Sequence, residues 1–212
     1  KIEANTAQWR KMVKTADQED AHADPDARLM KHRRTGTLRG FNAQIAVDMD
    51  GEGFILANHV SNKAKDSGEM ETILENLKAA GELPETIVAD AGYDSGPNLQ
   101  ALADESVTSF VSPHGKYDSF WEIRDGQLRC PAGHTPRFIG RHPNKGVLYD
   151  DYAVTACRAC PLKKVCDVKT RKTISARAGY HPAVRVANAH RTTTEKGGEM
   201  RRRRSTTVER AF

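Results

Sequence analysis

The strongest constraint on the fold is the alternation of strand-like and helix-like segments in the first half of the 212-residue chain. Phe41–Asp48 and Phe54–Asn62 are rich in apolar and β-branched residues, and the Asp- and Gly-rich residues between them predict the turn of a β-hairpin. Thr86–Ala89 and Val107–Val111 are shorter apolar runs that are typical of buried strands. These four segments predict the strands of one core.

Two helices are expected among these strands. Asp66 opens the first helix, with Glu69 three residues later as its capping partner, and apolar residues then recur at helical spacing up to Gly81. Ser95 and Pro97 start the second helix, because a side-chain acceptor and a proline both favour a first helical turn. The order hairpin, helix, strand, helix and strand predicts an α/β fold with a mixed sheet.

Residues 114–190 show a different pattern. Their periodicity is weak, they contain many Gly and Pro residues, and they hold all four cysteines. We interpret this segment as an insertion that has its own local stabiliser, and from about Thr194 onward the pattern is helical again. The predicted organisation is a catalytic core over residues 1–113, a cysteine-containing insertion over residues 114–190, and a C-terminal helix of the core over residues 191–212.

The net charge of +5 conceals a strong asymmetry along the chain. Pro161–Phe212 contains 14 basic and 4 acidic residues, a net charge of +10, so the remainder carries a net charge of −5. A basic C-terminal quarter on a mildly acidic body indicates a polyanionic partner, most commonly nucleic acid. A solvated charged surface without a partner is the alternative interpretation.

Composition excludes some classes of protein. Apolar residues make up 38% of the chain, and no stretch approaches the roughly 20 apolar residues that a membrane-spanning helix requires, so no membrane partner is expected. Four cysteines are few for a secreted disulfide scaffold of this length, which favours a cytoplasmic, reducing setting.

The cysteines are spaced C-x26-C-x2-C-x5-C. They are Cys130, Cys157, Cys160 and Cys166. The CxxC pair allows two thiolates from one turn to reach the same ion, and four thiolates satisfy a tetrahedral structural Zn²⁺. His134 and His142 are substitute ligands in this interpretation. The alternatives are four free thiols or disulfides.

Two carboxylates have notable positions. Asp90 follows the apolar run Thr86–Ala89, and ligand sites in open α/β sheets gather beyond the carboxyl ends of strands. Glu209 lies on the last expected helix beside Val208 and Phe212, which would face the core. The alternatives are an Asp that caps a turn and a surface Glu that pairs with an Arg on the same helix.

These segments together resemble the DDE transposases of bacterial insertion sequences, in the branch with a cysteine-containing insertion before the last helix. The matching stretches are DPDARLMK (24–31), GFNAQIAVD (40–48), ETIVADAGYDS (85–95), CPAGH (130–134), ACPLKKVC (159–166) and RRRRSTTVERAF (201–212). They follow one another in the expected order over nearly the whole chain.

The resemblance implies an RNase H-like fold in which three carboxylates bind two Mg²⁺ ions, typically about 3.5–4 Å apart. It makes Asp90 the second carboxylate and Glu209 the third. The first would belong to an Asp-Gly-Thr directly before a Lys-Ile, and this chain begins with Lys-Ile. We therefore expect a fragment that lacks the first strand and is inactive alone. Asp48 is a weaker candidate for the first carboxylate, because the resemblance places it in the hairpin turn.

The last helix departs from the relatives at one position. They carry a Tyr eight residues before the Glu and an Arg five residues before it, where this chain has Arg201 and Arg204. The four consecutive arginines are expected to contact the DNA backbone. They are Arg201, Arg202, Arg203 and Arg204.

The function implied is cleavage of double-stranded DNA at transposon ends and strand transfer into target DNA. The complete enzyme would be a homodimer in the bacterial cytoplasm, associated with the nucleoid when bound. A non-catalytic, zinc-stabilised DNA-binding remnant is the main alternative, and an RNase H-like nuclease of another purpose is a third.

Overall fold

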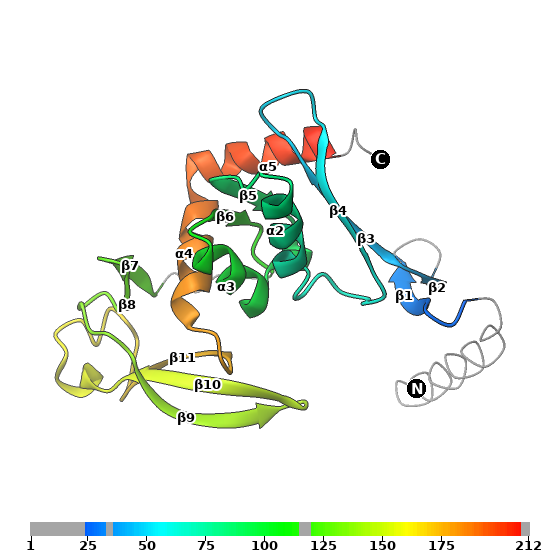
Figure 1. The fold of residues 1–212 in the computed structure, drawn as a ribbon. Helices are drawn as coiled ribbons and strands as arrows, with labels where there is room; N and C mark the ends of the chain where they lie inside the picture. The colour runs from blue at the N-terminus through cyan, green and yellow to red at the C-terminus, as the bar shows by residue number, and fades with distance from the viewer. Residues whose placement is uncertain (1–23, 33–35, 115–119, 209–212) are drawn as a thin grey trace.

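The computed structural model describes residues 24–32, 36–114 and 120–208. This part of the chain forms a mixed α/β structure with four α-helices and several small sheets (Figure 1). Two hydrophobic clusters are present, one under the strand–helix core and one in the cysteine-containing region. No helix in the described ranges is long and apolar enough to cross a membrane.

Two antiparallel hairpins open the described chain. β1 (Arg28–His32) pairs with β2 (Gly36–Gly40), and β3 (Asn42–Val47) pairs with the longer β4 (Ile55–Ser61). The predicted hairpin is therefore confirmed. Its turn is closed by a hydrogen bond of 2.9 Å from the backbone N–H of Asp48 to the carbonyl oxygen of the residue that precedes β4.

The core continues with α2 (Met70–Ala79), β5 (Thr86–Ala89), α3 (Gly96–Asp104) and β6 (Thr108–Val111). β5 and β6 are parallel, as a strand–helix–strand unit requires. Apolar side chains at helical spacing on α2 pack beneath these strands, and Ser95 caps α3 by accepting a hydrogen bond from a backbone N–H in its first turn. The predicted order of elements is confirmed.

The expected capping box at the start of α2 is wrong. The helix begins at Met70, and the side chain of Glu69 makes no capping hydrogen bond. Glu69 is fully buried and forms ion pairs with Lys63 and His59, at 2.8 and 3.2 Å. The side chain of Asn98 instead accepts hydrogen bonds from the first N–H groups around α2. A buried carboxylate that lies against the ammonium of Lys63 would lose that partner by turning toward the helix end.

The expected single mixed sheet is divided into two. β3 pairs with β4, and β5 pairs with β6, but β3 and β5 do not pair with each other. A cavity of about 400 Å³ lies between them, lined by consecutive residues of β3 and of β5. Each of these strands therefore has one edge that faces the cavity.

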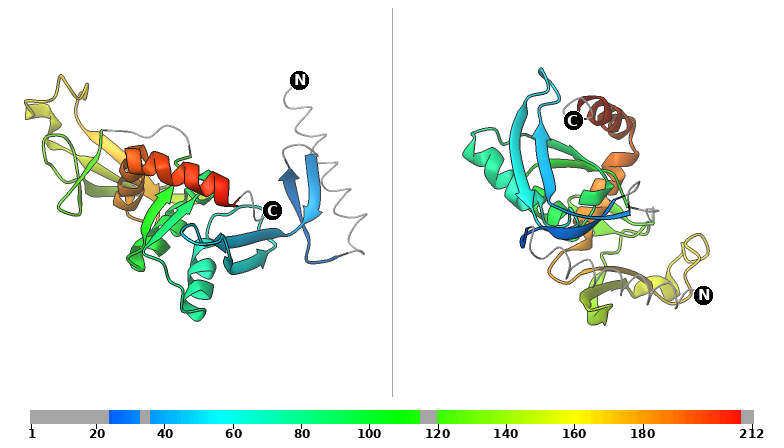
Figure 2. Two further views of the ribbon diagram at one scale, coloured as in Figure 1. Left: turned by 90° about the horizontal axis from the view of Figure 1, so that it is seen from above. Right: turned by 90° about the vertical axis from the view of Figure 1, so that its right-hand side faces the viewer.

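The cysteine-containing region is richer in strands than its weak periodicity indicated. Its strands are β7 (Glu122–Arg124), β8 (Gln127–Arg129), β9 (Arg137–Asn144), β10 (Val147–Val154) and β11 (Lys172–Arg177). β9, β10 and β11 form a three-stranded antiparallel sheet, and β7 pairs with β8. We call residues 120–181 the cysteine lobe; it lies at the end of the molecule away from β1 and β2 (Figures 1 and 2).

Two further helices join the lobe to the core. α4 (Pro182–Thr193) begins within the range expected for the insertion and packs against β6 and α3. Asn188 donates to the carbonyl of Val111 at 2.8 Å and accepts from its N–H at 2.9 Å, so one buried side chain satisfies both backbone groups of the last residue of β6. α5 (Glu195–Val208) then crosses beside β5 (Figure 2).

Candidate functional site

Asp90 stands at the carboxyl end of β5, as the sequence predicts, and lines the cavity between β3 and β5. Its Oδ1 accepts a hydrogen bond of 2.9 Å from the N–H of Gly92 and so caps the short 3-10 helix Ala91–Tyr93. Its Oδ2 lies 3.2 Å from Nη2 of Arg204 on α5. The side chain is half exposed, which leaves its oxygens accessible from the cavity.

Asp66 is a second carboxylate at this place, and the sequence analysis assigned it only to a helix start. Oδ1 of Asp66 accepts hydrogen bonds from the side-chain amides of Asn42 and Gln44 on β3, at 2.8 and 2.9 Å. An ideal Cβ on Gly92 would lie 2.2 Å from Oδ2 of Asp66 and 3.0 Å from Oδ1 of Asp90, so these two oxygens are at most about 5.2 Å apart.

The pKa of Tyr93 reflects both its burial and the negative charges around it. Burial, followed by the charges of Asp66, Asp90 and Glu69, raises its pKa well above the ordinary value, and Arg204 acts in the opposite direction. The phenol therefore remains a neutral hydrogen-bond donor at any physiological pH. A negative potential beside accessible carboxylate oxygens is the environment that a divalent cation prefers.

Glu209 lies outside the described residues. The residue before it, Val208, lines the same cavity as Asp90 and Arg204. Within the described ranges, no group of three or more His, Cys, Asp or Glu side chains has the spacing of a metal site. Among the carboxylates that line the cavity in the described chain, Asp66 and Asp90 are the pair placed close together.

Three other aspartates near the start of the chain differ in position. Asp48 lines the same cavity at the end of β3, where its Oδ1 accepts a hydrogen bond of 2.9 Å from the N–H of Asp50 in the hairpin turn. Asp24 and Asp26 lie at the surface before β1 and share a local turn hydrogen bond. These two do not line the cavity.

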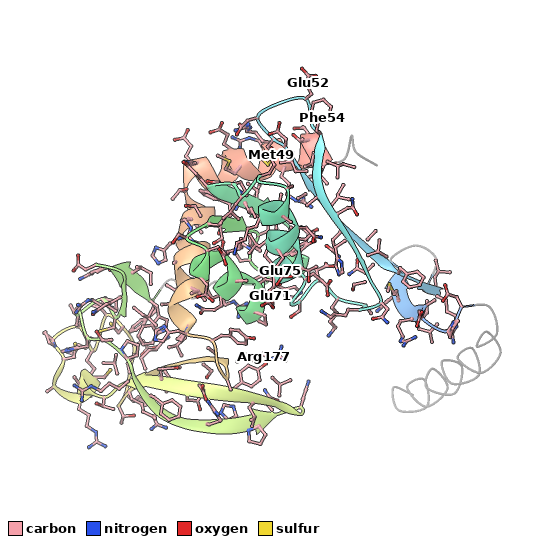
Figure 3. All side chains as sticks on the ribbon, in the orientation of Figure 1. Met49, Glu52, Phe54, Glu71, Glu75 and Arg177 are labelled. Carbon is pink, nitrogen blue, oxygen red and sulfur yellow. The ribbon has the colours of Figure 1, made fainter. Side chains whose placement is uncertain are left out.

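Three of the four consecutive arginines contact their own chain. Arg201 donates to the carbonyl oxygen of Thr192 at 2.5 Å, and Arg203 donates to Oδ1 of Asp50 at 2.5 Å in the β3–β4 turn. Arg204 contacts Asp90, as described above. Arg202 is exposed. Met49, Glu52 and Phe54 mark the tip of the hairpin, which lies beside the last turns of α5 (Figure 3).

Cys157 and Cys160 share one turn of the cysteine lobe, and Cys130 and Cys166 come from other turns. Cys130 and Cys157 are buried in its hydrophobic cluster, Cys166 packs against that cluster, and none of the four forms a disulfide. The pKa of the Cys166 thiol is raised, first by burial and then by the charges of Cys160, Cys130 and Cys157. Three of the four cysteines thus belong to or border one hydrophobic cluster, although the described side chains do not form a group that could hold a metal.

The two candidate histidine ligands are placed differently. His142 is in contact with Asp151, with 3.0 Å between Nδ1 and Oδ2, and stacks on Tyr149 of the neighbouring strand. His134 is exposed next to the turn that contains Cys130.

Comparison with known proteins gives one match. Residues 129–212, which are 84 of the 212 residues, match a family model described as the transposase DDE domain. The match spans the cysteine lobe from Arg129, α4 and α5, and it supports a DDE transposase family for this chain. No curated protein and no solved structure matches the chain significantly.

Proposed function

We propose that this chain is the catalytic region of a DDE transposase, which in its complete form cleaves double-stranded DNA at transposon ends and joins the freed strand to target DNA. One observation carries the proposal. Arg204 of α5 lies 3.2 Å from Asp90 at the end of β5, 114 residues earlier, so two motifs far apart in the sequence meet in one cavity.

Asp90 and Glu209 are the residues proposed to hold Mg²⁺. Carboxylate oxygens are the ligands that Mg²⁺ prefers, and the cavity offers the carboxylates of Asp90 and Asp66 with oxygens within about 5.2 Å of each other. When bound, the ions supply an activated attacking oxygen and a stabilised leaving oxygen. The amides of Asn42 and Gln44 fix Asp66, and Arg204 holds Asp90 toward α5.

The proposal includes an RNase H-like core over residues 1–113 to which one more strand contributes. The open edges of β3 and β5 support this part, since both face the same cavity and neither is paired there. A strand inserted between them would join the two small sheets into one mixed sheet. Its end would bring a further carboxylate to Asp90 if it carries the Asp-Gly-Thr of the relatives. Without that strand the chain is proposed to be inactive.

A structural Zn²⁺ held by the four cysteines is a further part of the proposal. The clustering of the thiols around buried Cys130 and Cys157 and the absence of disulfides within the described residues support it. Zinc analysis together with X-ray absorption should give close to one zinc per chain with sulfur ligands at about 2.3 Å. Zinc-free protein whose four thiols all react under native conditions would rule this part out.

The main alternative is a DNA-binding remnant without catalytic activity. It is favoured by one observation, the net charge of +10 over Pro161–Phe212, which DNA binding requires whether or not the protein is catalytic. The upstream carboxylate separates the two possibilities, because only a catalytic protein needs it.

The test is Mg²⁺-dependent nicking of a labelled duplex that carries the terminal repeats flanking the gene. The chain alone should not nick it, and the chain extended by an upstream strand ending in Asp-Gly-Thr should. Asp90→Asn should abolish the recovered activity, whereas the matched change Asp125→Asn, in the exposed turn between β7 and β8, should not. Absence of nicking and of DNA binding by the extended protein would refute the proposal.

A further inference from the structure

The arginine run on α5 is poorly placed to supply most of the DNA contacts. Arg201 and Arg203 already donate to oxygens of the same chain, and Arg204 faces Asp90. These contacts occupy part of each guanidinium, and the carboxylates beside Arg203 and Arg204 already offset their charge, which reduces the net gain from binding a phosphate. The cations that bind DNA should therefore be sought elsewhere.

A denser set of available cations lies on the loop between β10 and β11 of the cysteine lobe. Residues 155–172 contain six Lys and Arg residues and one acidic residue, Asp167. Five of the six are exposed, and these form no ion pair within the described chain: Arg158, Lys163, Lys164, Lys169 and Arg171. We call these five residues the lobe cations.

The loop that carries the lobe cations is held in a defined conformation by its own hydrogen bonds and buried residues. Backbone hydrogen bonds of 3.1 Å from Lys163 to the carbonyl of Cys160 and of 2.9 Å from Cys166 to that of Leu162 shape it into successive turns. Cys157 and Val168, near its two ends, are buried in the second hydrophobic cluster. The cations are thus presented on a shaped surface, which lowers the entropy cost of binding a partner.

The tip of the loop adds an apolar side chain. Val165 is 83% exposed and lies between Lys164 and Cys166. The two lysines directly before Val165 are exposed as well, and exposed cations of this kind suit the phosphates of the DNA backbone. The lobe lies at the end of the molecule away from the β1–β2 hairpin, so a duplex could reach it without contacting that hairpin (Figures 1 and 2).

We propose that the lobe cations form a docking surface for the phosphate backbone of duplex DNA, separate from the cavity that holds Asp90. This inference rests on the proposed transposase function and adds to it the surface that binds the duplex. Because the lobe cations would bind phosphates, the affinity should depend steeply on salt and weakly on sequence.

The experiment compares two double variants of equal charge change by fluorescence anisotropy with a labelled duplex of random sequence, at several salt concentrations. Lys163→Ser/Lys164→Ser removes two lobe cations. Lys31→Ser/Lys65→Ser is the matched control, because both lysines are exposed and lie outside the lobe. The lobe variant should bind more weakly, and its plot of log affinity against log salt should be flatter by about 0.9 for each phosphate that it no longer neutralises. The control should match the unaltered protein.

Thermal unfolding and far-UV circular dichroism of both variants confirm that the fold is retained. If the unaltered protein binds DNA and the lobe variant binds it as the control does, the docking surface is refuted while the proposed function stands. If the unaltered protein does not bind DNA at any salt concentration, both fail. Equal binding to anionic lipid vesicles and to DNA, with both abolished in the lobe variant, would also overturn the assignment to DNA.

Discussion

At the scale of single residues, Gly92 is the point where the two carboxylates of the cavity meet. Asp90 accepts from its N–H, and Asp66 lies against its Cα. A side chain fits there only if Asp66 shifts, because a Cβ would be 2.2 Å from Oδ2 of Asp66. Glycine is favoured at this position by the close approach of the Asp66 side chain to the backbone. The backbone conformation does not call for glycine, since it is not in the left-handed region.

Asp66→Ala should destabilise the protein by about 1–3 kcal/mol, because the amides of Asn42 and Gln44 lose their shared acceptor and Gln44 is almost fully buried. Chemical denaturation measures the change. Asp104→Ala is the control, since Asp104 accepts only an exposed amide in the described structure and its removal should cost less than about 0.5 kcal/mol. Equal costs for the two variants would contradict the role given to Asp66.

Gly92→Ala should also destabilise, by about 1–3 kcal/mol, through the clash with Asp66. If the clash is the cause, Gly92→Ala should lower the free energy of unfolding less in the Asp66→Ala protein than in the unaltered one. A double-mutant cycle measures this difference. Gly140→Ala is the control, because an added Cβ there meets nothing within 4 Å. Additive effects at positions 92 and 66 would show that the two residues do not press on each other.

At the scale of elements, the core strands and helices were predictable because each has a clear period and a turn signal at its ends. β5 coincides with the predicted run Thr86–Ala89. The start of α2 was missed because Glu69 satisfies its charge with Lys63 and His59, ion pairs that no local pattern reveals. The hydrogen bonds from Asn42 and Gln44 on β3 to Asp66 were missed likewise, because they join residues that lie far apart in the sequence.

The cysteine lobe was predicted least well. Polar residues lie on both faces of β9, and almost all of its residues are exposed. The strand therefore lacks the alternation of apolar and polar residues from which a strand is predicted. α4 has few strongly apolar residues and is held instead by polar contacts such as those of Asn188 and Arg191 with β6. Long-range polar pairing leaves no periodicity in the sequence.

The ion pair between Arg141 and Asp150 predicts how the stability of the β9–β10 hairpin changes in acid. Arg141 contacts both carboxylate oxygens of Asp150, at 2.5 and 3.0 Å, and thereby lowers the pKa of Asp150 below its ordinary value of 3.8. A lowered pKa in the folded state gives stability that is present above the unfolded-state pKa and is lost as pH falls through the folded-state pKa. The hairpin should therefore lose stability below about pH 4.

The measurement is thermal unfolding between neutral pH and pH 3, compared with Asp150→Asn, which lacks the titrating group. The variant should be less stable at neutral pH and should depend less on pH in the acidic range. Identical acid profiles would mean that the Arg141–Asp150 pair does not contribute to stability in solution. Glu122→Gln, in an exposed pair with Arg124 on β7, is the control.

At the scale of the whole molecule, α4 connects the two hydrophobic clusters. Val186 belongs to the cluster of the cysteine lobe, Val184 packs against the cluster of the core, and Asn188 binds the edge of β6. A helix that contributes to both clusters should couple their unfolding. The lobe on which DNA is proposed to dock is thereby held in a fixed relation to the cavity of Asp90.

Asn188→Ala should weaken that coupling. The change leaves both backbone groups of Val111 buried without their partners, at a cost of about 2–4 kcal/mol in all. The chain has two tryptophans, so both proteins carry Trp9→Phe, which leaves Trp121, buried in the lobe, as the fluorophore. Unfolding followed by its fluorescence should coincide with unfolding followed by circular dichroism when Asn188 is present and should separate from it in the Asn188→Ala variant. Asn76→Ala is the matched control, because its amide donates to an exposed backbone carbonyl and its removal should leave the two transitions together. If the two transitions still coincide in Asn188→Ala, at a lower denaturant concentration, other contacts of α4 are enough to couple the lobe to the core. If the two transitions already separate in the unaltered protein, the coupling itself is refuted.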